Sequence, residues 1–276
     1  MNAISSESDL LVSSQVTRHR PGESPVGEQD WLAREEPLEI RVRGQSIAVT
    51  MRTPGHDAEL ACGFLVSEGL LHKRQDVTEV AHCTSGEAAN LGNVINVFVA
   101  SSIQLDLGAL TRHVFASSSC GLCGKASIES VYQHFPPIAQ ISSINSDVIR
   151  SLPEQLIPAQ TAFSKTGGVH AAALFTIKGE LLVLREDVGR HNAVDKVVGW
   201  AFLNENLPLA NHILLVSGRA SFEIMQKALS AGIPIVAAVS APSSLAAEFA
   251  RESGQVLIGF LRGGSFNVYA GDGCVH

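Results

Sequence analysis

Two cysteines three positions apart, Cys120 and Cys123, are the residues of this sequence best suited to chemistry. They lie between glycines in the run SSCGLCGK (118–125). The reactive form of cysteine is the thiolate, whose pKa falls beside a cation or at the start of a helix. Lys125 is a neighbouring cation, and the apolar spacing over residues 126–135 predicts a helix whose amino end points toward the thiols. Because the glycines let a bulky partner approach the loop, the run suits a sulfur that must meet something large.

Three interpretations compete for this CxxC motif. The first is half of a structural zinc site, completed by a second pair such as His82 and Cys83; zinc sites usually bring a second tight pair, and none stands in this sequence. The second is a dithiol–disulfide redox centre, although no thioredoxin-like βαβ unit surrounds the short strand expected at 114–116. The third is a sulfur carrier, in which one cysteine holds a persulfide and the other assists. The motif alone leaves all three open.

Composition limits the classes of function. With 276 residues, the chain forms one large domain or two ordinary ones, with enough apolar residues for a core. A net charge of -7 without a basic block argues against nucleic-acid binding. No apolar run reaches the ~18 to 20 residues that span a bilayer, and the polar N-terminus does not resemble a signal peptide. The five cysteines do not form a disulfide pattern. These features predict a cytoplasmic protein.

The N-terminal half is expected to contain a flexible leader and a small domain. Residues 1–30 are rich in Ser, Glu, Pro and Gly, which predicts a poorly ordered segment. Residues 31–150 read as a β-rich α+β domain that carries the CxxC loop. A hairpin turn is expected at Gly44, and Asp57 is a suitable N-cap for the helix that follows. The expected strands are 38–43, 46–52, 77–83 and 93–100.

Residues 151–276 change in character and are expected to form an α/β domain. Strands alternate with helices there, which implies right-handed crossovers and a mainly parallel sheet covered by helices. The fold class is therefore α/β in this half and α+β overall. The expected strands are 169–177, 180–185, 212–216, 233–239, 256–261 and 266–269, and the expected helices are 192–204, 222–231 and 245–252.

Four of these strands are followed by loops rich in Gly, Ser and Arg. Open α/β sheets bind ligands at the carboxyl ends of their strands, where free N–H groups at helix starts favour anions. Each loop alone has the composition of an ordinary turn or cap, but four together predict a phosphate-bearing ligand. No P-loop or GxGxxG fingerprint occurs, so the ligand is nucleotide-like but held differently. The loops are 186–191, 217–221, 240–244 and 262–265.

A histidine in the strand expected at 169–177 excludes one class of enzyme. The run TGGVHAA (166–172) places His170 where a zinc deaminase would have His-x-Glu, but the glutamate is missing and the CxxC precedes the histidine. Deamination is therefore disfavoured. His170, Asp187 and His191 are each compatible with a cap, a ligand contact or proton exchange, and their individual roles stay open.

Six ordered motifs resemble the formate dehydrogenase accessory sulfurtransferase family (FdhD/NarQ family). The resemblance runs from about residue 30 to the C-terminus, and six motifs in order are far more specific than any one of them. The motifs are EEPL (35–38), TPGHD with ACGFL (53–57 and 61–65), SCGLCG (119–124), TGGVH (166–170), EDVGRHNAVDK (186–196) and SGR (217–219).

The resemblance implies a function that the residues alone do not give. Members of that family take sulfur from a cysteine desulfurase and pass it to the molybdenum (or tungsten) bis-guanine-dinucleotide cofactor of formate dehydrogenase. It also implies a cytidine deaminase-like, three-layer larger domain and a homodimer. The partners would be the desulfurase and the formate dehydrogenase catalytic subunit, with Mo-bis(molybdopterin guanine dinucleotide) as bound substrate and no resident metal. Which formate dehydrogenase is served, and with which metal, is left open.

The resemblance also assigns residues. Cys120 matches the persulfide-bearing cysteine of the family and Cys123 its second thiol. A segment that holds the cofactor matches Phe260, Leu261, Arg262, Gly263, Gly264 and Ser265, and we add the residues of the anion-binding edge, Ser217, Gly218, Arg219, Arg190 and His191. Buried packing is the expected role of Cys62, Cys83 and Cys274. The alternatives are a non-catalytic cofactor-binding chaperone and a protein with a structural-zinc or redox CxxC motif.

Overall fold

A computed structural model describes the chain except for residues 1–9, 85–91, 102, 104–134, 140 and 142. Cys120 and Cys123, the strand expected at 114–116 and all but the last residue of the helix expected at 126–135 lie outside the described residues. In the described part, no helix is long and apolar enough to cross a membrane.

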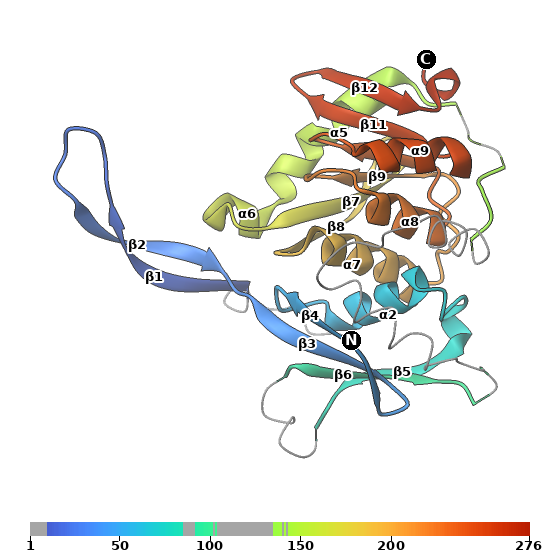
Figure 1. The fold of residues 1–276 in the computed structure, drawn as a ribbon, viewed down its shortest axis with the longest axis horizontal. Coiled ribbons are helices and arrows are strands. Elements are labelled where there is room, and N and C mark those ends of the chain that lie inside the picture. Colours follow the sequence, from blue (N-terminus) through green and yellow to red (C-terminus); the bar gives the residue numbers. More distant parts are fainter. Residues whose placement is uncertain (1–9, 85–91, 102, 104–134, 140, 142) are drawn as a thin grey trace.

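The described residues form three sheets and six α-helices, an α+β arrangement (Figure 1). The strands are β1 (Leu11–Arg18), β2 (Val26–Ala33), β3 (Glu36–Val42), β4 (Gln45–Arg52), β5 (Val77–His82), β6 (Val94–Val99), β7 (His170–Thr176), β8 (Leu181–Asp187), β9 (His212–Val216), β10 (Ile235–Ala238), β11 (Val256–Arg262) and β12 (Ser265–Ala270). The helices are α2 (Asp57–Ser67), α5 (Ser146–Ala159), α6 (Thr161–Thr166), α7 (Arg190–Leu203), α8 (Phe222–Ser230) and α9 (Ser244–Ser253), with short 3-10 turns η1 (Arg74–Asp76) and η3 (Asp272–Cys274).

The largest sheet has six strands in the order β12-β11-β10-β9-β7-β8. The parallel pairs are β9 with β10 and β10 with β11, while β7 pairs antiparallel with both of its neighbours and β12 pairs antiparallel with β11. The prediction of a mainly parallel sheet was therefore wrong. A four-residue turn (177–180) joins β7 to β8 and a two-residue turn (263–264) joins β11 to β12, and strands joined by such short turns run antiparallel.

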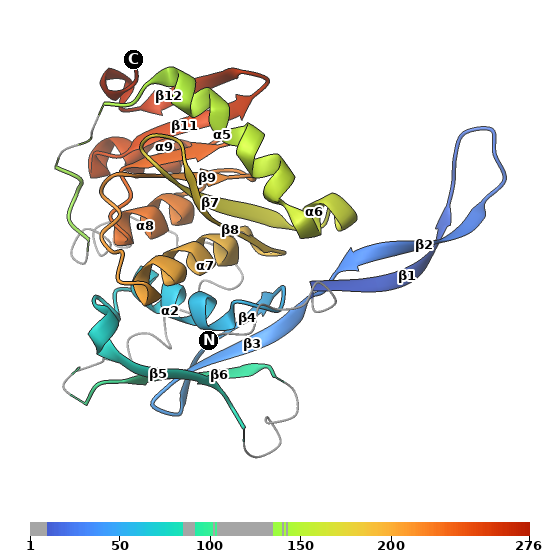
Figure 2. The same ribbon diagram turned by 180° about the vertical axis from the view of Figure 1, so that it is seen from behind.

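Helices cover both faces of this sheet. On one face, α7, α8 and α9 pack on alternate strand residues such as Leu214 and Val236, and on the other face α5 packs on Ile213 and Ile235 (Figures 1 and 2). The alternation follows from the two-residue side-chain period of a strand. A second sheet, β4-β3-β6-β5, lies beyond α2, which packs against α7. Helix α2 and the helices α7 and α8 that it contacts therefore lie between the two sheets, whereas α5 covers the outer face.

The helices α2 and α7 approach each other at two glycines. A Cβ atom on Gly63 would overlap the carbonyl oxygen of Asp195 and lie 2.8 Å from the Gly199 nitrogen. A Cβ atom on Gly199 would overlap the carbonyl oxygen of Glu59 in the same way. Because glycine has no Cβ, the two backbones touch directly, and this contact joins the N-terminal sheet to the rest of the protein.

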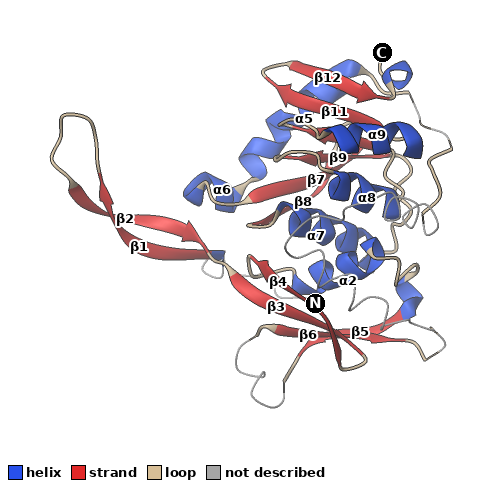
Figure 3. Ribbon diagram, viewed as in Figure 1, coloured by secondary structure: helices blue, strands red, loops and turns tan. Residues whose placement is uncertain are grey.

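The predicted leader is the main correction to the element assignment. From Leu11 to Ala33 the chain forms an eight-pair antiparallel ribbon, β1 with β2, which projects from the body (Figures 1 and 3). Its base is held by a small apolar cluster of Leu11, Ala162 and Val169. The ribbon keeps polar residues on both faces, so its composition is that of a disordered segment even though its backbone is paired.

The predicted domain boundary at residue 150 falls inside a helix. Helix α5 is continuous from Ser146 to Ala159 and contains Pro153 and Pro158, the residues that indicated a boundary in the sequence. One apolar cluster also includes residues from both sides, such as Leu60 of α2 and Val194 of α7. The division into domains 31–150 and 151–276 remains a prediction.

Candidate functional site at the sheet edge

The four loops singled out in the sequence share one edge of the six-stranded sheet. Because β8 runs in the same direction as β9, β10 and β11, all four strands end there, and β7 begins there. Backbone hydrogen bonds link neighbouring loops: the Val239 N–H donates to Val216 O at 3.0 Å, and the Phe260 N–H donates to Ser240 O at 3.0 Å. The edge is thus continuous from α7 to the β11–β12 turn.

A group of polar residues gathers where β7 begins and β9 ends. The Ser217 hydroxyl accepts a hydrogen bond from the Ala171 N–H at 2.8 Å. Next to it, a Cβ atom on Gly218 would lie 3.3 Å from His170 Nδ1 and 4.0 Å from Arg190 Cδ. Arg219 is exposed beside this group. The structure therefore brings Arg190, Ser217 and Gly218 together with His170, whose role the sequence left open.

Asp187 holds the turn that precedes α7. Its carboxylate is fully buried and pairs with the buried Lys196 ammonium at 2.7 Å. It also accepts hydrogen bonds from the Gly189 N–H, the Asn192 amide and, at 3.1 Å, the Thr53 N–H. Lys196 in turn donates to Thr53 O at 2.9 Å. Asp187 is therefore a structural residue, and sequence reasoning missed Lys196, Asn192 and Thr53 because no spacing rule connects them.

The three helices that start at this edge differ in how their first N–H groups are satisfied. At α9, the Ser243 hydroxyl accepts from the Ala246 N–H at 3.2 Å. At α8, no side chain caps the helix, but the acid Glu223 stands in the first turn. At α7, the N-cap is Gly189, with no side-chain cap and no acid in the first turn. Among these three starts, α7 is the one open to an anion.

Arg190, the first residue of α7, carries a buried donor without an acceptor. Its Nε atom is buried and has no hydrogen-bond partner among the described residues. A buried donor left without a partner costs about 1 to 3 kcal/mol. An anionic ligand at the start of α7 would satisfy both this donor and the free helix N–H groups. The start of α7 is therefore the best-supported anion position at the edge.

His191 lies on the next position of α7 and is held neutral. Burial, together with the Arg190 and Lys227 cations, lowers the pKa of His191 to about 4. Its Nε2 lies 3.3 Å from the Ser221 hydroxyl and 3.9 Å from a Glu223 carboxylate oxygen. Burial and the Arg190 cation also lower the pKa of His170. Two neutral imidazoles thus flank the anion position.

We expect His191 to lower the free energy of unfolding as the pH falls below 6.5. The unfolded chain binds a proton at this histidine below its ordinary pKa of 6.5, whereas the folded chain resists until about 4. The free energy of unfolding should therefore decrease as pH falls through this window. The decrease should be smaller in His191→Asn, as measured by urea unfolding at about pH 7 and about pH 5. An equal decrease in both proteins would contradict the assignment.

The predicted cofactor segment 260–265 lies at another part of the same edge. Phe260 adopts a left-handed φ of 54°, which is rare for a bulky residue, and the Arg262 guanidinium lies 5.5 Å from its ring centroid. Leu261 to Gly264 line a groove of about 550 Å³ beside α5. Strands β9 and β11 flank β10, so this segment begins about 10 Å from the end of β9. The predicted cofactor residues thus form two groups.

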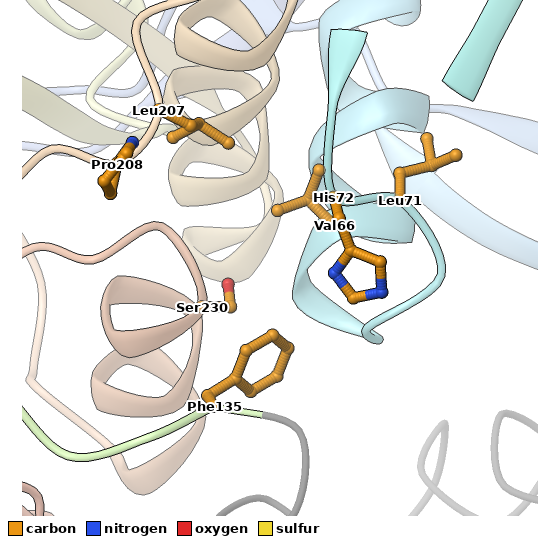
Figure 4. A pocket seen from close by; sticks show the side chains of 7 residues that line it. All are labelled: Val66, Leu71, His72, Phe135, Leu207, Pro208 and Ser230. Atoms are coloured by element: carbon orange, nitrogen blue, oxygen red, sulfur yellow. The ribbon is translucent and has the colours of Figure 1, made fainter. Parts of the chain in front are cut away.

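A second cavity lies at the opposite edge of the sheet. It has a volume of about 160 Å³ and lies between the carboxyl ends of α2 and α8 (Figure 4). Its lining includes Phe135, Val66 and Ser230. Phe135 is the first residue after the segment 104–134, so the chain that carries the two CxxC thiols rejoins the described structure far from the Arg190 group.

The sequence is similar to one known protein family and to curated relatives. The sequence matches the model of the FdhD/NarQ family over residues 33–276. It is 51% identical over 259 residues to the sulfur carrier protein FdhD of Mycobacterium tuberculosis, an alignment that covers 91% of this chain and 94% of the relative. It is 53% identical over 247 residues to the protein of the same name from Streptomyces coelicolor, with 88% of each chain covered.

A solved structure shows the same fold. The crystal structure of a formate dehydrogenase accessory protein from Desulfotalea psychrophila superposes with a TM-score of 0.76 at 26% sequence identity. The superposition covers 97% of this chain and all of that one. The resemblance carried by the six sequence motifs is confirmed.

Proposed function

The chain belongs to the FdhD/NarQ family, and on this premise we propose that it is a sulfurtransferase that matures formate dehydrogenase. Sulfur carriage and a link to formate dehydrogenase are what its relatives are named for. The partners would be a cysteine desulfurase and the formate dehydrogenase catalytic subunit, and the protein would act in the cytoplasm as a homodimer. The single observation that carries the proposal is the CxxC pair inside a family match over residues 33–276.

The first step is a thiol–persulfide exchange at Cys120. Its thiolate attacks the outer sulfur of the desulfurase persulfide, the S–S bond of the desulfurase breaks, and the desulfurase thiolate leaves. Cys120 then carries the sulfur as S–SH. Lys125 and the helix expected after it would favour the thiolate form. Cys123 would assist release of the sulfur to the acceptor.

The acceptor is Mo-bis(molybdopterin guanine dinucleotide), bound as a substrate, with no metal resident in the protein. Its phosphates would occupy the open start of α7, where Arg190 has an unpartnered donor. Gly218 lets a ligand approach between His170 and Arg190, and Arg219 adds a cation at the rim. Residues 260–265 would contact a further part of the same large ligand. The resemblance also leads us to propose a cytidine deaminase-like relationship for this α/β half.

The chain length permits the carrier and the cofactor site to meet. Twelve positions separate Cys123 from Phe135, and with the helix expected at 126–135 they reach up to about 24 Å. Five to seven strand residues span about 16 to 23 Å, which is less than this reach. A thiol tethered at the Phe135 edge can therefore serve a cofactor held at the Arg190 edge.

We expect Arg190→Ala to weaken binding of GDP, a probe for one arm of the cofactor. Loss of a charge-assisted contact costs about 1.5 to 3 kcal/mol, which corresponds to about 10- to 100-fold in Kd. Isothermal titration calorimetry measures this directly. Arg251→Ala is the matched control, because Arg251 stands in the last turn of α9, away from the edge. Equal GDP affinity in wild type and Arg190→Ala would place the phosphates elsewhere.

A further inference from the structure

The turn of the β3–β4 hairpin carries a residue that the turn itself does not favour. Arg43 and Gly44 form it, with left-handed φ angles of 51° and 78° (Figure 1). Two-residue hairpin turns with two positive φ angles favour Asn-Gly, and a long side chain is strained there. Strained residues of this kind cluster at functional positions, where the surrounding structure holds them. The side chain of Arg43 should therefore have a task that an asparagine would not perform.

The Arg43 guanidinium holds the chain that leaves β6. It donates to Ala100 O at 3.1 Å and to Ile103 O at 2.8 Å. The Ile103 N–H in turn donates to Ala100 O at 3.1 Å, so the chain turns directly after β6. Ile103 is the last described residue before residues 104–134, the segment that carries the CxxC motif. Arg43 thus fixes the point at which this segment begins.

The segment 104–134 ends beside the same stretch of chain. The Ala100 N–H donates to Asp76 O at 2.9 Å, and the Asp76 carboxylate accepts from the His72 N–H at 2.9 Å. His72 and Phe135, the first described residue after the segment, line one cavity (Figure 4). Phe135 is 8% exposed and belongs to the main apolar core. The two ends of the segment are therefore both fixed beside residues 72–76.

We propose that Arg43 is a positioning residue for sulfur transfer, which fixes the first end of the CxxC-bearing segment beside its second end at Phe135. This inference rests on the proposed function, which assigns sulfur carriage to Cys120. Attachment at both ends limits the volume that a tethered thiol can search and raises its effective concentration at a site on the same protein. It has no such effect on a donor protein that arrives from solution. Loss of the Arg43 contacts should therefore slow delivery of sulfur more than loading.

The variant Arg43→Asn separates this role from a contribution to stability. Asparagine is favoured in the turn, so the free energy of unfolding should change little, while both contacts with the chain after β6 are lost. Hydrogen exchange at the Ile103 amide, followed by mass spectrometry, should become faster. Loading of sulfur by a cysteine desulfurase, measured by intact mass, should be unchanged. Formate dehydrogenase maturation should fall about 2- to 10-fold, the value of one hydrogen bond.

Two further variants control this experiment. Arg251→Asn is the matched control, because the Arg251 guanidinium also donates to a backbone carbonyl, Tyr269 O at 3.2 Å, in another part of the protein. It should leave exchange at Ile103, sulfur loading and maturation unchanged. Arg43→Lys keeps a donor for the same carbonyl oxygens and should restore much of the lost maturation.

The outcomes separate the inference from the proposed function. If wild type loads no sulfur, both fall. If exchange at Ile103 becomes faster in Arg43→Asn while maturation equals that of wild type, the inference falls alone. An equal loss of loading, maturation and folded protein would make Arg43 a structural residue and overturn the inference. Should Arg43→Asn fail to fold, Arg43→Gly removes the same contacts and relieves the strain of the positive φ, and unchanged maturation there would contradict the proposal.

Discussion

Addition of one methyl group at Gly63 is expected to destabilise the protein by about 3 kcal/mol or more. The Cβ atom of an alanine there would overlap the backbone carbonyl of Asp195, and a backbone cannot turn aside as a flexible side chain can. Helices α2 and α7 would have to separate, which would open the packing between the two large sheets. Gly199→Ala should have a comparable effect, because the contact is reciprocal.

Thermal and urea unfolding of the two variants check this expectation. Gly27→Ala is the control, since a Cβ atom at that glycine of β2 meets nothing within 4 Å. The control should unfold like wild type. If Gly63→Ala were as stable as Gly27→Ala, the close approach of α2 and α7 would not exist in solution.

Replacement of Cys120 by serine is expected to abolish formate dehydrogenase maturation. A hydroxyl cannot hold a persulfide, so the sulfur would have no carrier. Thermal unfolding of the double variant Cys120→Ser, Cys123→Ser should stay close to that of wild type, because the carrier thiols contribute chemistry and not a metal-linked part of the folding energy. Formate dehydrogenase activity in cells that lack the native gene product measures the first effect.

Other cysteines provide the controls for this experiment. Cys62 is buried in the core, and burial raises the pKa of its thiol to about 12, so it is inert. Cys274→Ser changes a partly exposed thiol and should leave maturation intact. A large drop in melting temperature of the double variant, with loss of stoichiometric zinc, would support the structural-zinc interpretation. Maturation retained in Cys120→Ser, with the cofactor still bound, would support a non-catalytic chaperone.

Local signals predicted most elements well. The glycine turn predicted the β3–β4 hairpin, and the structure places β9 at His212–Val216, as expected. The helix after Asp57 is α2, although its N-cap is His56 rather than Asp57. The carboxylate of Asp57 instead binds the buried Arg52 guanidinium through two hydrogen bonds. Apolar periodicity and turn residues act within a few positions, which is why they succeeded.

Features that depend on contacts between residues far apart in the sequence could not be predicted from it. The β1–β2 ribbon carries polar residues on both faces beside exposed Val12, Trp31 and Leu32, and its Ser-, Glu-, Pro- and Gly-rich composition suggested a disordered leader. The sheet was expected to be mainly parallel because strands that alternate with helices imply crossover connections, but β7 and β12 pair antiparallel with their neighbours. The prediction that four loops share one edge nevertheless holds, since β8 runs in the same direction as β9.

The residues of the candidate site were likewise only partly predictable from the sequence. Arg190, Ser217 and Gly218 were singled out because they follow strands, and the structure brings them together, while their role in binding stays a prediction. Thr53 was missed because its contacts with Asp187 and Lys196 join segments that lie far apart in the sequence.

The most direct test of the sulfur-carrier function is intact-mass analysis of the protein after incubation with a cysteine desulfurase and cysteine. We predict a gain of one sulfur atom in wild type, mapped by peptide analysis to Cys120, absent in Cys120→Ser and present in Cys274→Ser. A gain that persists in Cys120→Ser and disappears in Cys123→Ser would reverse the roles of the two thiols. No gain of sulfur on either cysteine would contradict the sulfur-carrier function itself.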